Sequence, residues 1–320
     1  MLKSFFIMIM ILALLTACGC ARQKTVSKIS NSVQDASLSA SVSSTASPNT
    51  SITPDPSGNP DTTITPIPTG KPVLTPTPVP TITPVPTITV LIPEGFTASQ
   101  IGDRLETKGV CKKKDFLDTI LTYDFSYYPL VAAIPANLGR CYKLEGYLYP
   151  NTYIFYLNMK PQDVIGKMLR QAEDKIGSIY PYTGMSTDQV ITLASIIQSE
   201  AASLADMKKV SSVFHNRLKS GMQLQADPTI YYVEHYLKPN LTGDINRFNA
   251  YYNTYKCKAL PAGAICNPGS DALHAAVTPA DTDFLYFVTD KVGKFYYAVT
   301  WEEHVANCAT AGVIPPSKED

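Results

Sequence analysis

A carboxylate at the end of an apolar helical stripe is the residue of this chain best suited to acid–base chemistry. Glu200 lies three and four residues beyond Ile197 and Ile196, so it continues a stripe that should face the core. A charged carboxylate on a buried face costs free energy unless it is paired or protonated. Burial therefore predicts a raised pKa, which would let Glu200 donate and accept a proton near neutral pH. The simpler alternative is a glutamate at a frayed helix end that points to water.

The element that must position Glu200 is a helix over residues 187–200. Ser186 can cap its first turn, and Gln189, three residues on, completes a capping-box pattern. A second helix should begin after Ser203 and end near Gly221, with a buried stripe of its own. Its basic residues are expected on its solvated face: Lys208, Lys209, Arg217 and Lys219. Two adjacent helices that both bury a stripe place Glu200 near the joint between them.

Other polar side chains that could take part in a site lie in irregular or aromatic-rich segments. Glu145 lies in the aromatic run of residues 144–155, where Tyr and Phe serve either as core residues or as stacking surfaces for sugar rings. Asp227 precedes Pro228 in a turn, and a helix should follow to about Tyr236. Loops that are rich in amides and hydroxyls often bind polar ligands. The candidate binding residues are Gln225, Asp227, Asn253, Tyr255 and Glu145, each of which could equally be a turn or capping residue.

The overall composition excludes some classes of protein. The 320 residues carry 27 basic and 27 acidic side chains, so the charge balance indicates no nucleic-acid partner. With only 4 histidines and no Cys-x-x-Cys motif, neither a dedicated metal site nor a cofactor is predicted. Cysteines of an exported chain can form disulfides. Loop length would allow Cys257 with Cys266 and Cys111 with Cys141, although connectivity cannot be read from spacing.

The first residues have the pattern of an export signal. Lys3 precedes an apolar run from Phe5 to Leu15 that is too short for an ordinary membrane span. The tetrad Leu15-Thr-Ala-Cys18 resembles a bacterial lipobox, so residues 1–17 should be removed and Cys18 should be lipidated. An ordinary signal peptide with a chance cysteine is the alternative. A lipid on Cys18 would hold the chain outside the cytoplasm, anchored to the outer face of the cell membrane.

Residues 18–87 are predicted to be a disordered tether. They are rich in Ser, Thr and Pro and poor in large apolar side chains, so they cannot offset the entropy of ordering. The run Pro78-Val-Pro-Thr-Ile-Thr83 is repeated directly from Pro84 to Thr89. Proline at alternate positions favours extended polyproline II and prevents a helix.

Ordered structure should begin near Ile88, and its pattern indicates an α+β fold. A strand there is followed by helices from Thr97 to Gly109 and from Lys114 to Thr122, an order typical of a small LysM-like module, assigned to residues 88–142. Residues 143–314 should form a second, mixed helical and antiparallel-sheet domain. It has a helix from Pro161, a short helix over 270–277 and a hairpin of residues 284–288 and 295–299. Residues 315–320 are a polar tail.

Several runs, in this order, resemble those of the endolytic murein transglycosylases, the YceG-like family. They are Ile92-Pro-Glu-Gly-Phe-Thr97, Leu144-Glu-Gly-Tyr-Leu-Tyr-Pro-Asn-Thr-Tyr153, Leu193-Ala-Ser-Ile-Ile-Gln-Ser-Glu200, Val213-Phe-His-Asn-Arg-Leu218, Gly221-Met-Gln-Leu-Gln-Ala-Asp-Pro-Thr-Ile-Tyr231 and Tyr252-Asn-Thr-Tyr255. The resemblance covers residues 88–310, and several motifs in the right order are more specific than any one alone. It departs at Gln198, Ala201 and Asn151, where the family's motifs carry an acid, a threonine and an aspartate, and in the run 259–265.

The resemblance implies a LysM-like subdomain followed by a catalytic domain with Glu200 as its acid. It implies cleavage of the MurNAc–GlcNAc β-1,4 bond within nascent peptidoglycan strands, which would terminate strand elongation. Such a lytic transglycosylase, a carbon–oxygen lyase, adds no water and leaves a 1,6-anhydroMurNAc end. The candidate binding residues would hold the hydroxyl and acetamido groups of the sugars. The expected partners are peptidoglycan glycan strands and peptidoglycan synthases. The cytoplasmic membrane is a third, through the lipid on Cys18, and such an anchor departs from the spanning helix of the family.

Two other functions fit the same residues. The first is a wall-binding scaffold that keeps the LysM-like module but has no activity. The altered motifs favour this alternative, whereas the intact Glu200 argues against it. A muramidase that uses water would need a second carboxylate at a defined separation from Glu200, for which Glu145 and Asp227 are candidates. The products distinguish these readings: anhydro ends, reducing ends or no cleavage.

Overall fold

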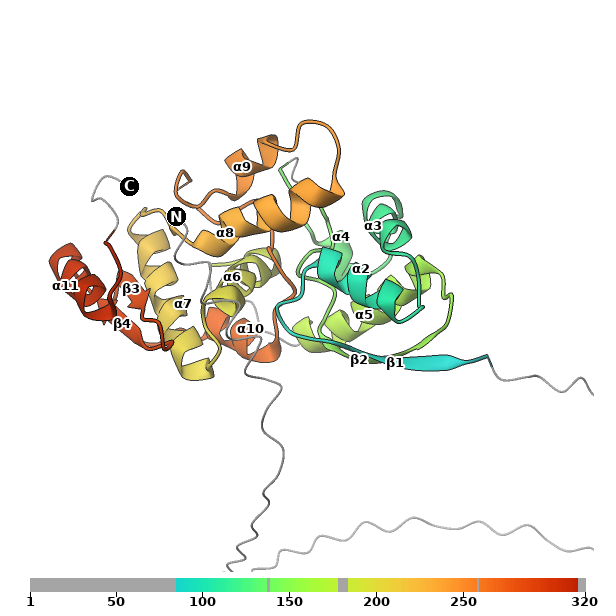
Figure 1. Cartoon of the computed structure of the whole chain (residues 1–320), viewed down its shortest axis with the longest axis horizontal. Helices are drawn as coiled ribbons and strands as arrows, with labels where there is room; N and C mark the ends of the chain where they lie inside the picture. Colours follow the sequence, from blue (N-terminus) through green and yellow to red (C-terminus); the bar gives the residue numbers. More distant parts are fainter. Residues whose placement is uncertain (1–84, 137–138, 178–183, 258, 316–320) are drawn as a thin grey trace, which may run out of the picture. The chain divides into compact units, whose positions relative to one another are not determined.

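The computed structural model describes residues 85–136, 139–177, 184–257 and 259–315 (Figure 1). The predicted signal peptide of residues 1–17, the lipidation site Cys18, nearly all of the predicted tether 18–87 and most of the predicted tail lie outside the described residues. Within the described ranges, no helix is both long enough and apolar enough to cross a membrane. These ranges form helices and small antiparallel sheets, which confirms the predicted α+β class.

The first sheet joins the start of the described chain to a strand that follows the predicted LysM-like module. β1 (Thr87–Ile92) pairs antiparallel with β2 (Asn151–Tyr156), with Thr87 opposite Tyr156. Between them lie α2 (Ala98–Thr107), α3 (Lys113–Thr122) and α4 (Pro129–Ala132). The pairing crosses the boundary predicted between residues 142 and 143, and the LysM-like assignment itself stays a prediction.

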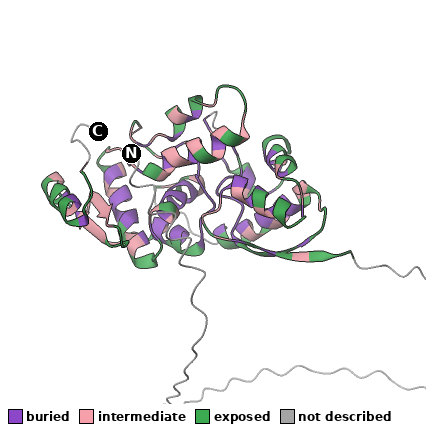
Figure 2. Cartoon of the chain, in the orientation of Figure 1, coloured by how far each residue is buried: buried purple, intermediate pink, exposed green. Residues whose placement is uncertain are grey.

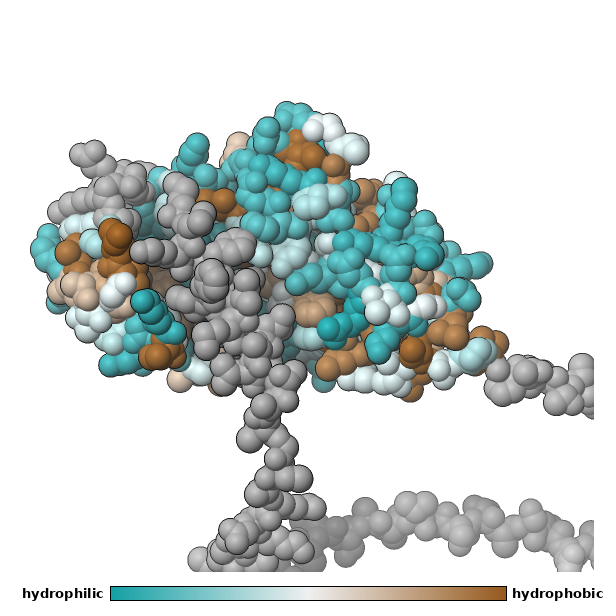
Figure 3. All heavy atoms as spheres, in the orientation of Figure 1, coloured by the Kyte–Doolittle hydropathy of each residue, from teal (hydrophilic) through white to brown (hydrophobic). Residues whose placement is uncertain are grey.

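The faces of the β1–β2 sheet differ in burial, as the alternation of side chains along a strand requires. Val90 and Phe155 are completely buried on the inner face. On the outer face Leu91, Ile154 and Tyr156 are exposed, and hydrophobic residues gather over this sheet in Figure 3. The sheet therefore gives one face to the core and the other to solvent.

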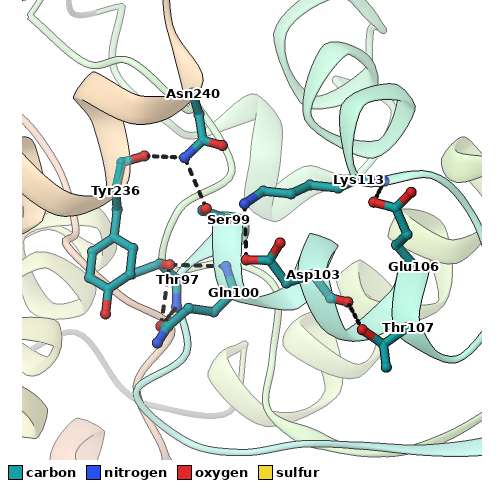
Figure 4. A network of polar contacts seen from close by, with 9 residues as sticks. All are labelled: Thr97, Ser99, Gln100, Asp103, Glu106, Thr107, Lys113, Tyr236 and Asn240. Carbon is teal, nitrogen blue, oxygen red and sulfur yellow. Dashed lines mark hydrogen bonds and ion pairs between the residues drawn. The ribbon is translucent and has the colours of Figure 1, made fainter.

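Polar contacts hold the start of α2 and connect it to a later part of the chain (Figure 4). The backbone N of Gln100 donates to Thr97 Oγ1 at 3.2 Å, and the backbone N of Thr97 donates to Gln100 Oε1 at 3.0 Å, which completes a capping box. Asn240 Nδ2 donates to Ser99 Oγ at 3.0 Å and to the carbonyl oxygen of Tyr236 at 2.9 Å. The first turn of α2 is thereby joined to the helical segment around residue 236.

The remaining elements follow the predicted order. They are α5 (Pro161–Ile176), α6 (Thr187–Glu200), α7 (Leu204–Lys219), α8 (Asp227–Tyr232), the π-helix η2 (Val233–Leu237), the 3-10 helix η3 (Lys238–Asn240), α9 (Arg247–Tyr252), α10 (Ser270–Val277), β3 (Tyr286–Thr289), β4 (Phe295–Ala298) and α11 (Trp301–Ala311). β3 pairs antiparallel with β4, as predicted for the hairpin. The patterns do not predict α4, η3 and α9, because such short helices contain too few turns to show a period.

Helix α6 lies within the core of the described chain. Its residues from Val190 to Ile197 are all buried (Figure 2), and α7 and α10 pack against it. The predicted capping box of Ser186 and Gln189 is present. The hairpin packs on α7, where the rings of Phe214 and Phe287 meet edge to face at 6.0 Å. Glu200 is therefore the last residue of a helix that the core holds firmly.

The cysteines of the described ranges are all free thiols: Cys111, Cys141, Cys257, Cys266 and Cys308. The two bridges that loop length would allow, Cys257 with Cys266 and Cys111 with Cys141, are not formed. Cys266 is buried against α6, with its Sγ donating to the carbonyl oxygen of Ser195 at 3.2 Å, whereas the Cys257 thiol donates to the carbonyl of Asn253. Loop length permits a bridge but does not show which way each side chain points.

Candidate active site

Glu200 is half-buried at the C-terminal end of α6. The stripe that precedes it, Leu193, Ile196 and Ile197, is completely buried. No hydrogen bond from a described residue reaches the Glu200 carboxyl group. The C-terminal end of a helix also carries partial negative charge, which disfavours an anion there. The carboxyl group therefore has little to stabilise its ionised form.

Burial, and after it the carboxylate of Asp227, raises the pKa of Glu200 from its usual 4.5 to about 8. Desolvation disfavours the charged form of an acid, and a nearby like charge adds to that effect. At neutral pH most Glu200 side chains therefore hold a proton that they can donate. The carboxylate left behind is a strong enough base to take a proton back.

Asp227 and Tyr255 lie close to Glu200 and hold each other in place. Tyr255 Oη donates to Asp227 Oδ1 at 2.6 Å. Burial raises the pKa of Tyr255, and the carboxylates of Asp227 and Glu200 raise it further. Asn253 Oδ1 accepts from the backbone N of Tyr255 at 2.9 Å, so the amide of Asn253 shapes this turn. The structure thus places Asp227 and Tyr255 beside Glu200, with Asn253 two residues before Tyr255 in the same turn.

The segment before Asp227 is fixed by hydrogen bonds to the turn that carries Tyr255. The backbone N of Gln225 donates to the carbonyl oxygen of Thr254 at 3.0 Å, and the backbone N of Ala226 donates to Thr254 Oγ1 at 2.9 Å. Gln225 has a φ of 51°, a left-handed conformation that costs free energy in a residue other than glycine. Such strain is concentrated at functional sites. Gln225 therefore shapes the loop that presents Asp227.

The prediction that Arg217 faces solvent is wrong, because its side chain is only 7% exposed. Arg217 Nη1 donates to the carbonyl oxygens of Gln223 and Leu224, both at 3.1 Å, and to Gln225 Oε1 at 3.0 Å. Its Nε donates to the carbonyl oxygen of Leu285 at 2.6 Å. Burial lowers the pKa of Arg217, but a guanidinium starts so high that it stays charged. Arg217 therefore joins α7, the Asp227 loop and the start of the hairpin.

Glu145 lies in the interior and not at the surface of the site, with 1% of its area exposed. Its carboxyl group accepts from the backbone N of Ala98 at 2.9 Å, from Tyr232 Oη at 3.0 Å and from Asn267 Nδ2 at 3.0 Å. Burial raises its pKa to about 8, although these hydrogen bonds act in the opposite direction. The protein encloses this carboxyl group almost completely, so a sugar at the surface cannot reach it. The expectation that Glu145 binds substrate is therefore corrected: it joins α2, α8 and the loop before α10.

Asn267 and Gln198 support the site without a clear signal in the sequence. Asn267 is completely buried; its Oδ1 accepts from the backbone N of Leu148 at 2.8 Å, and its Nδ2 also donates to the carbonyl oxygen of Phe96 at 2.9 Å. Gln198 Oε1 accepts from the backbone N of Gly269 at 2.8 Å. Asn267 precedes Pro-Gly, a pattern that predicts only a turn, and Gln198 contacts a residue 71 positions away, which no local pattern indicates.

A cavity of about 940 Å³ lies elsewhere on α6 and does not include Glu200. It is lined by Asp188 and Gln189 of α6, by His215 and Lys219 of α7, and by loops over residues 259–262 and 279–282. The described part of the chain holds no group of three or more His, Cys, Asp or Glu side chains that could bind a metal ion. The titratable cluster at Glu200, rather than cavity volume, identifies the candidate site.

Comparisons with known proteins agree on one family. The family model described as the YceG-like family matches residues 77–310. An endolytic murein transglycosylase of Streptococcus pneumoniae is 33% identical over 243 residues, which is 69% of this chain and 44% of that protein. One of Bacillus subtilis is 35% identical over 196 residues, 60% of this chain and 51% of that protein. The match thus spans about half the length of these curated relatives.

A solved structure shows the same similarity in three dimensions. The crystal structure of a yceG-like protein from Listeria monocytogenes superimposes with a TM-score of 0.61 at 35% sequence identity. The similarity covers 71% of this chain and 77% of that one. Sequence and fold therefore lead to the same group of proteins.

Proposed function

The chain belongs to the YceG-like family, and from that premise we propose that it is a lytic transglycosylase that cuts peptidoglycan glycan strands internally. The relatives in Streptococcus pneumoniae and Bacillus subtilis bear the name of this activity. The observation that carries the proposal is the half-buried Glu200, whose pKa of about 8 suits an acid that must later act as a base. One such group is enough for a cleavage that consumes no water.

In the proposed reaction, protonated Glu200 donates its proton to the glycosidic oxygen between MurNAc and GlcNAc. The bond from that oxygen to C1 of MurNAc breaks, and GlcNAc leaves with a free 4-hydroxyl group. The Glu200 carboxylate then accepts the proton of the MurNAc C6 hydroxyl as the C6 oxygen bonds to C1. One proton leaves Glu200 and one returns, so the enzyme ends as it began and the product carries a 1,6-anhydro ring.

Asp227 has two effects in this scheme. Its charge keeps Glu200 protonated before the reaction, and the same carboxylate would stabilise the positive charge that develops at C1. The hydrogen bond from Tyr255 keeps that carboxylate in one orientation. The amides of Gln225 and Asn253 lie on the same pair of segments and are the proposed contacts to the hydroxyl and acetamido groups of the sugars.

The test is the release of anhydro-muropeptides from uncrosslinked glycan strands by the full-length protein, followed by mass spectrometry. Glu200→Gln keeps the size of the side chain but cannot exchange the proton. General acid–base groups contribute about 10²–10⁴-fold, and one group here serves both steps, so the loss should be at the upper end or beyond. Glu145→Gln is the control: it should leave the cut products unchanged. Normal rates from a folded Glu200→Gln protein would overturn the proposal.

The position of Asp227 also favours one second candidate. A muramidase needs a second carboxylate near its acid, and Asp227 is close enough to raise the pKa of Glu200. That reaction would give reducing ends in place of anhydro ends. If the wild-type protein releases no fragments at all, the wall-binding scaffold is the function that remains.

We also propose that Cys18 carries a lipid and that residues 18–87 connect this anchor to the folded part. From the outer face of the membrane the enzyme would reach nascent strands and end their elongation beside peptidoglycan synthases. The support is the lipobox-like tetrad and the Ser/Thr/Pro composition. Cys18→Ala should release the protein from the membrane fraction or leave it unprocessed. A mature Cys18→Ala protein that still sediments with membranes would contradict the anchor.

A further inference from the structure

One face of α8 and η2 leads from Asp227 to two side chains, Tyr231 and His235, that the proposed reaction does not use. Asp227, Tyr231 and His235 recur every four residues along this segment; Asp227 and His235 are exposed and Tyr231 is half-exposed, whereas Thr229 and Tyr232 are buried. At about 1.5 Å per residue of α-helix, Tyr231 lies about 6 Å along the axis from Asp227, and His235 follows one turn further on. The row therefore begins at the candidate active site and leads away from it.

The rings of Tyr231 and His235 form a stacked pair. Their centroids are 3.8 Å apart and their planes differ by 14°. His235 Nδ1 lies 3.1 Å from the carbonyl oxygen of Tyr231, which can only accept, so this nitrogen carries the proton and the imidazole is held in one orientation. The ring of Tyr236 meets that of Tyr231 edge-on at 5.8 Å. The pair is thus an oriented aromatic surface with polar edges.

The stacked pair stands on a rigid part of the fold. On the buried side of the same helix, Tyr232 donates to Glu145 in the interior. At the far end, Asn240 joins the carbonyl of Tyr236 to Ser99 of α2, as Figure 4 shows. The π-helical turn that holds His235 is an uncommon element that occurs frequently at functional sites. A surface held in this way loses little freedom when it binds a ligand.

We infer that Tyr231 and His235 form a stacking subsite for a sugar ring of the glycan strand. The inference rests on the proposed function and names a substrate contact beyond the bond that is cut. A pyranose ring has apolar C–H faces and polar edges, which match a flat aromatic surface bordered by hydroxyl and imidazole groups. A strand held at Glu200 that follows α8 passes Asp227 and then this pair. The subsite would secure longer strands and would leave the chemistry at Glu200 unchanged.

The experiment measures how affinity depends on glycan length. In full-length Glu200→Gln protein, binding is followed by fluorescence anisotropy with end-labelled, uncrosslinked, peptide-free glycan oligomers of increasing length. Tyr231→Ala and His235→Ala should weaken the binding of long oligomers about fivefold to tenfold and leave the shortest bound oligomer unaffected. Tyr231→Phe keeps the ring and loses only the hydroxyl group, so it should retain most of the affinity of the parent. Tyr127→Ala removes a tyrosine that is 63% exposed elsewhere and should have no effect.

A second readout separates positioning of substrate from damage to the site. With Glu200 intact, Tyr231→Ala should raise KM for long strands severalfold and leave kcat unchanged. If Tyr231→Ala does not fold, Tyr231→Leu replaces it, since leucine fills the space without a ring.

The outcomes distinguish this inference from the function on which it rests. Equal affinity of the parent and Tyr231→Ala for long oligomers would overturn the subsite and leave the proposed function intact. An equal loss for short and long oligomers would also overturn it, because it would indicate disturbance of Asp227. If the parent binds no glycan and the wild type cuts none, the proposed function fails and the subsite fails with it.

Discussion

At the scale of single residues, neighbours decide what each carboxyl group can do. Glu145 and Glu200 both have pKa values of about 8, and burial is the first cause for both. Their surroundings nevertheless differ: protein donors occupy the oxygens of Glu145, whereas Glu200 is half-buried beside Asp227. The same raised pKa therefore belongs to a structural group in one place and to the proposed reactive group in the other.

The pH dependence of activity should follow the protonated form of Glu200. Because that form is present below the folded pKa, the rate should fall as pH rises through about 8. Asp227→Asn removes the like charge, lowers the pKa of Glu200 and should move the alkaline limb to lower pH. Rates of anhydro-product formation against pH measure this shift, with the exposed Asp281→Asn as control. An unmoved limb in Asp227→Asn would show that Asp227 does not tune Glu200.

Glu145 should make stability depend on pH. Its folded pKa is raised, so between about 4.5 and about 8 the folded state holds a proton that the unfolded state has lost. The free energy of unfolding therefore falls as pH rises through this window, with a slope of up to about 1.4 kcal/mol per pH unit for each such group. Denaturant titrations of Glu145→Gln should show a flatter dependence. Glu200→Gln should flatten it as well, and a steeper curve in either variant would contradict the burial argument.

Some of these residues could be predicted and others could not, for physical reasons. Glu200 could be predicted because it continues an apolar helical period. Asp227 and Tyr255 could be predicted because they lie in motifs that resemble those of the family. Arg217 follows Val213 and Phe214 at helical spacing, so the stripe itself indicated burial, but its charge argued for solvent. The burial of Glu145 depends on Asn267, 122 residues away, and no local pattern reports such a contact.

At the scale of elements, the long periodic helices were predictable and the close contacts between elements were not. α6 and α7 begin after the predicted caps Ser186 and Ser203, because both caps and periods are local. The partner of β1 was not predicted, since β2 follows it only after α2, α3 and α4. How closely two elements pack also cannot be predicted from local patterns, as Gly146 illustrates.

Gly146 allows the segment of Glu145 to pass close to α6. It has a φ of +91°, and a Cβ there would lie 2.6 Å from the Cβ of Ala264 and 2.7 Å from Cγ2 of Ile191. Gly146→Ala should therefore lower the free energy of unfolding by about 2–4 kcal/mol, from backbone strain and overpacking together. Gly221→Ala is a matched control, with φ +68° and nothing within 4 Å, and should lose only about 1 kcal/mol. Equal losses in denaturant titrations would refute the packing argument.

At the scale of the whole molecule, the ordered fold should be independent of the predicted tether. β1 begins at Thr87, and the backbone N of Leu157 donates to the carbonyl oxygen of Pro86. A chain that starts at residue 85 should therefore unfold within about 2 °C of the full-length protein. A chain that starts at residue 93 lacks Val90 and Ile92 of the core and should unfold several degrees lower. Thermal unfolding followed by circular dichroism tests both truncated chains. Loss of structure in the chain that starts at residue 85 would show that the ordered fold needs part of the predicted tether.

The buried carboxyl of Glu145 also has a consequence for the rate of folding. Its hydrogen-bond partners lie 47, 87 and 122 residues away along the chain, so the last contact must wait until distant segments meet. In the open chain at neutral pH the group is ionised, yet in the closed interior it holds a proton. Glu145 must therefore take up a proton from solvent as the chain folds. Refolding should be faster in mildly acidic than in alkaline solution, so the proton acts as a reactant in folding.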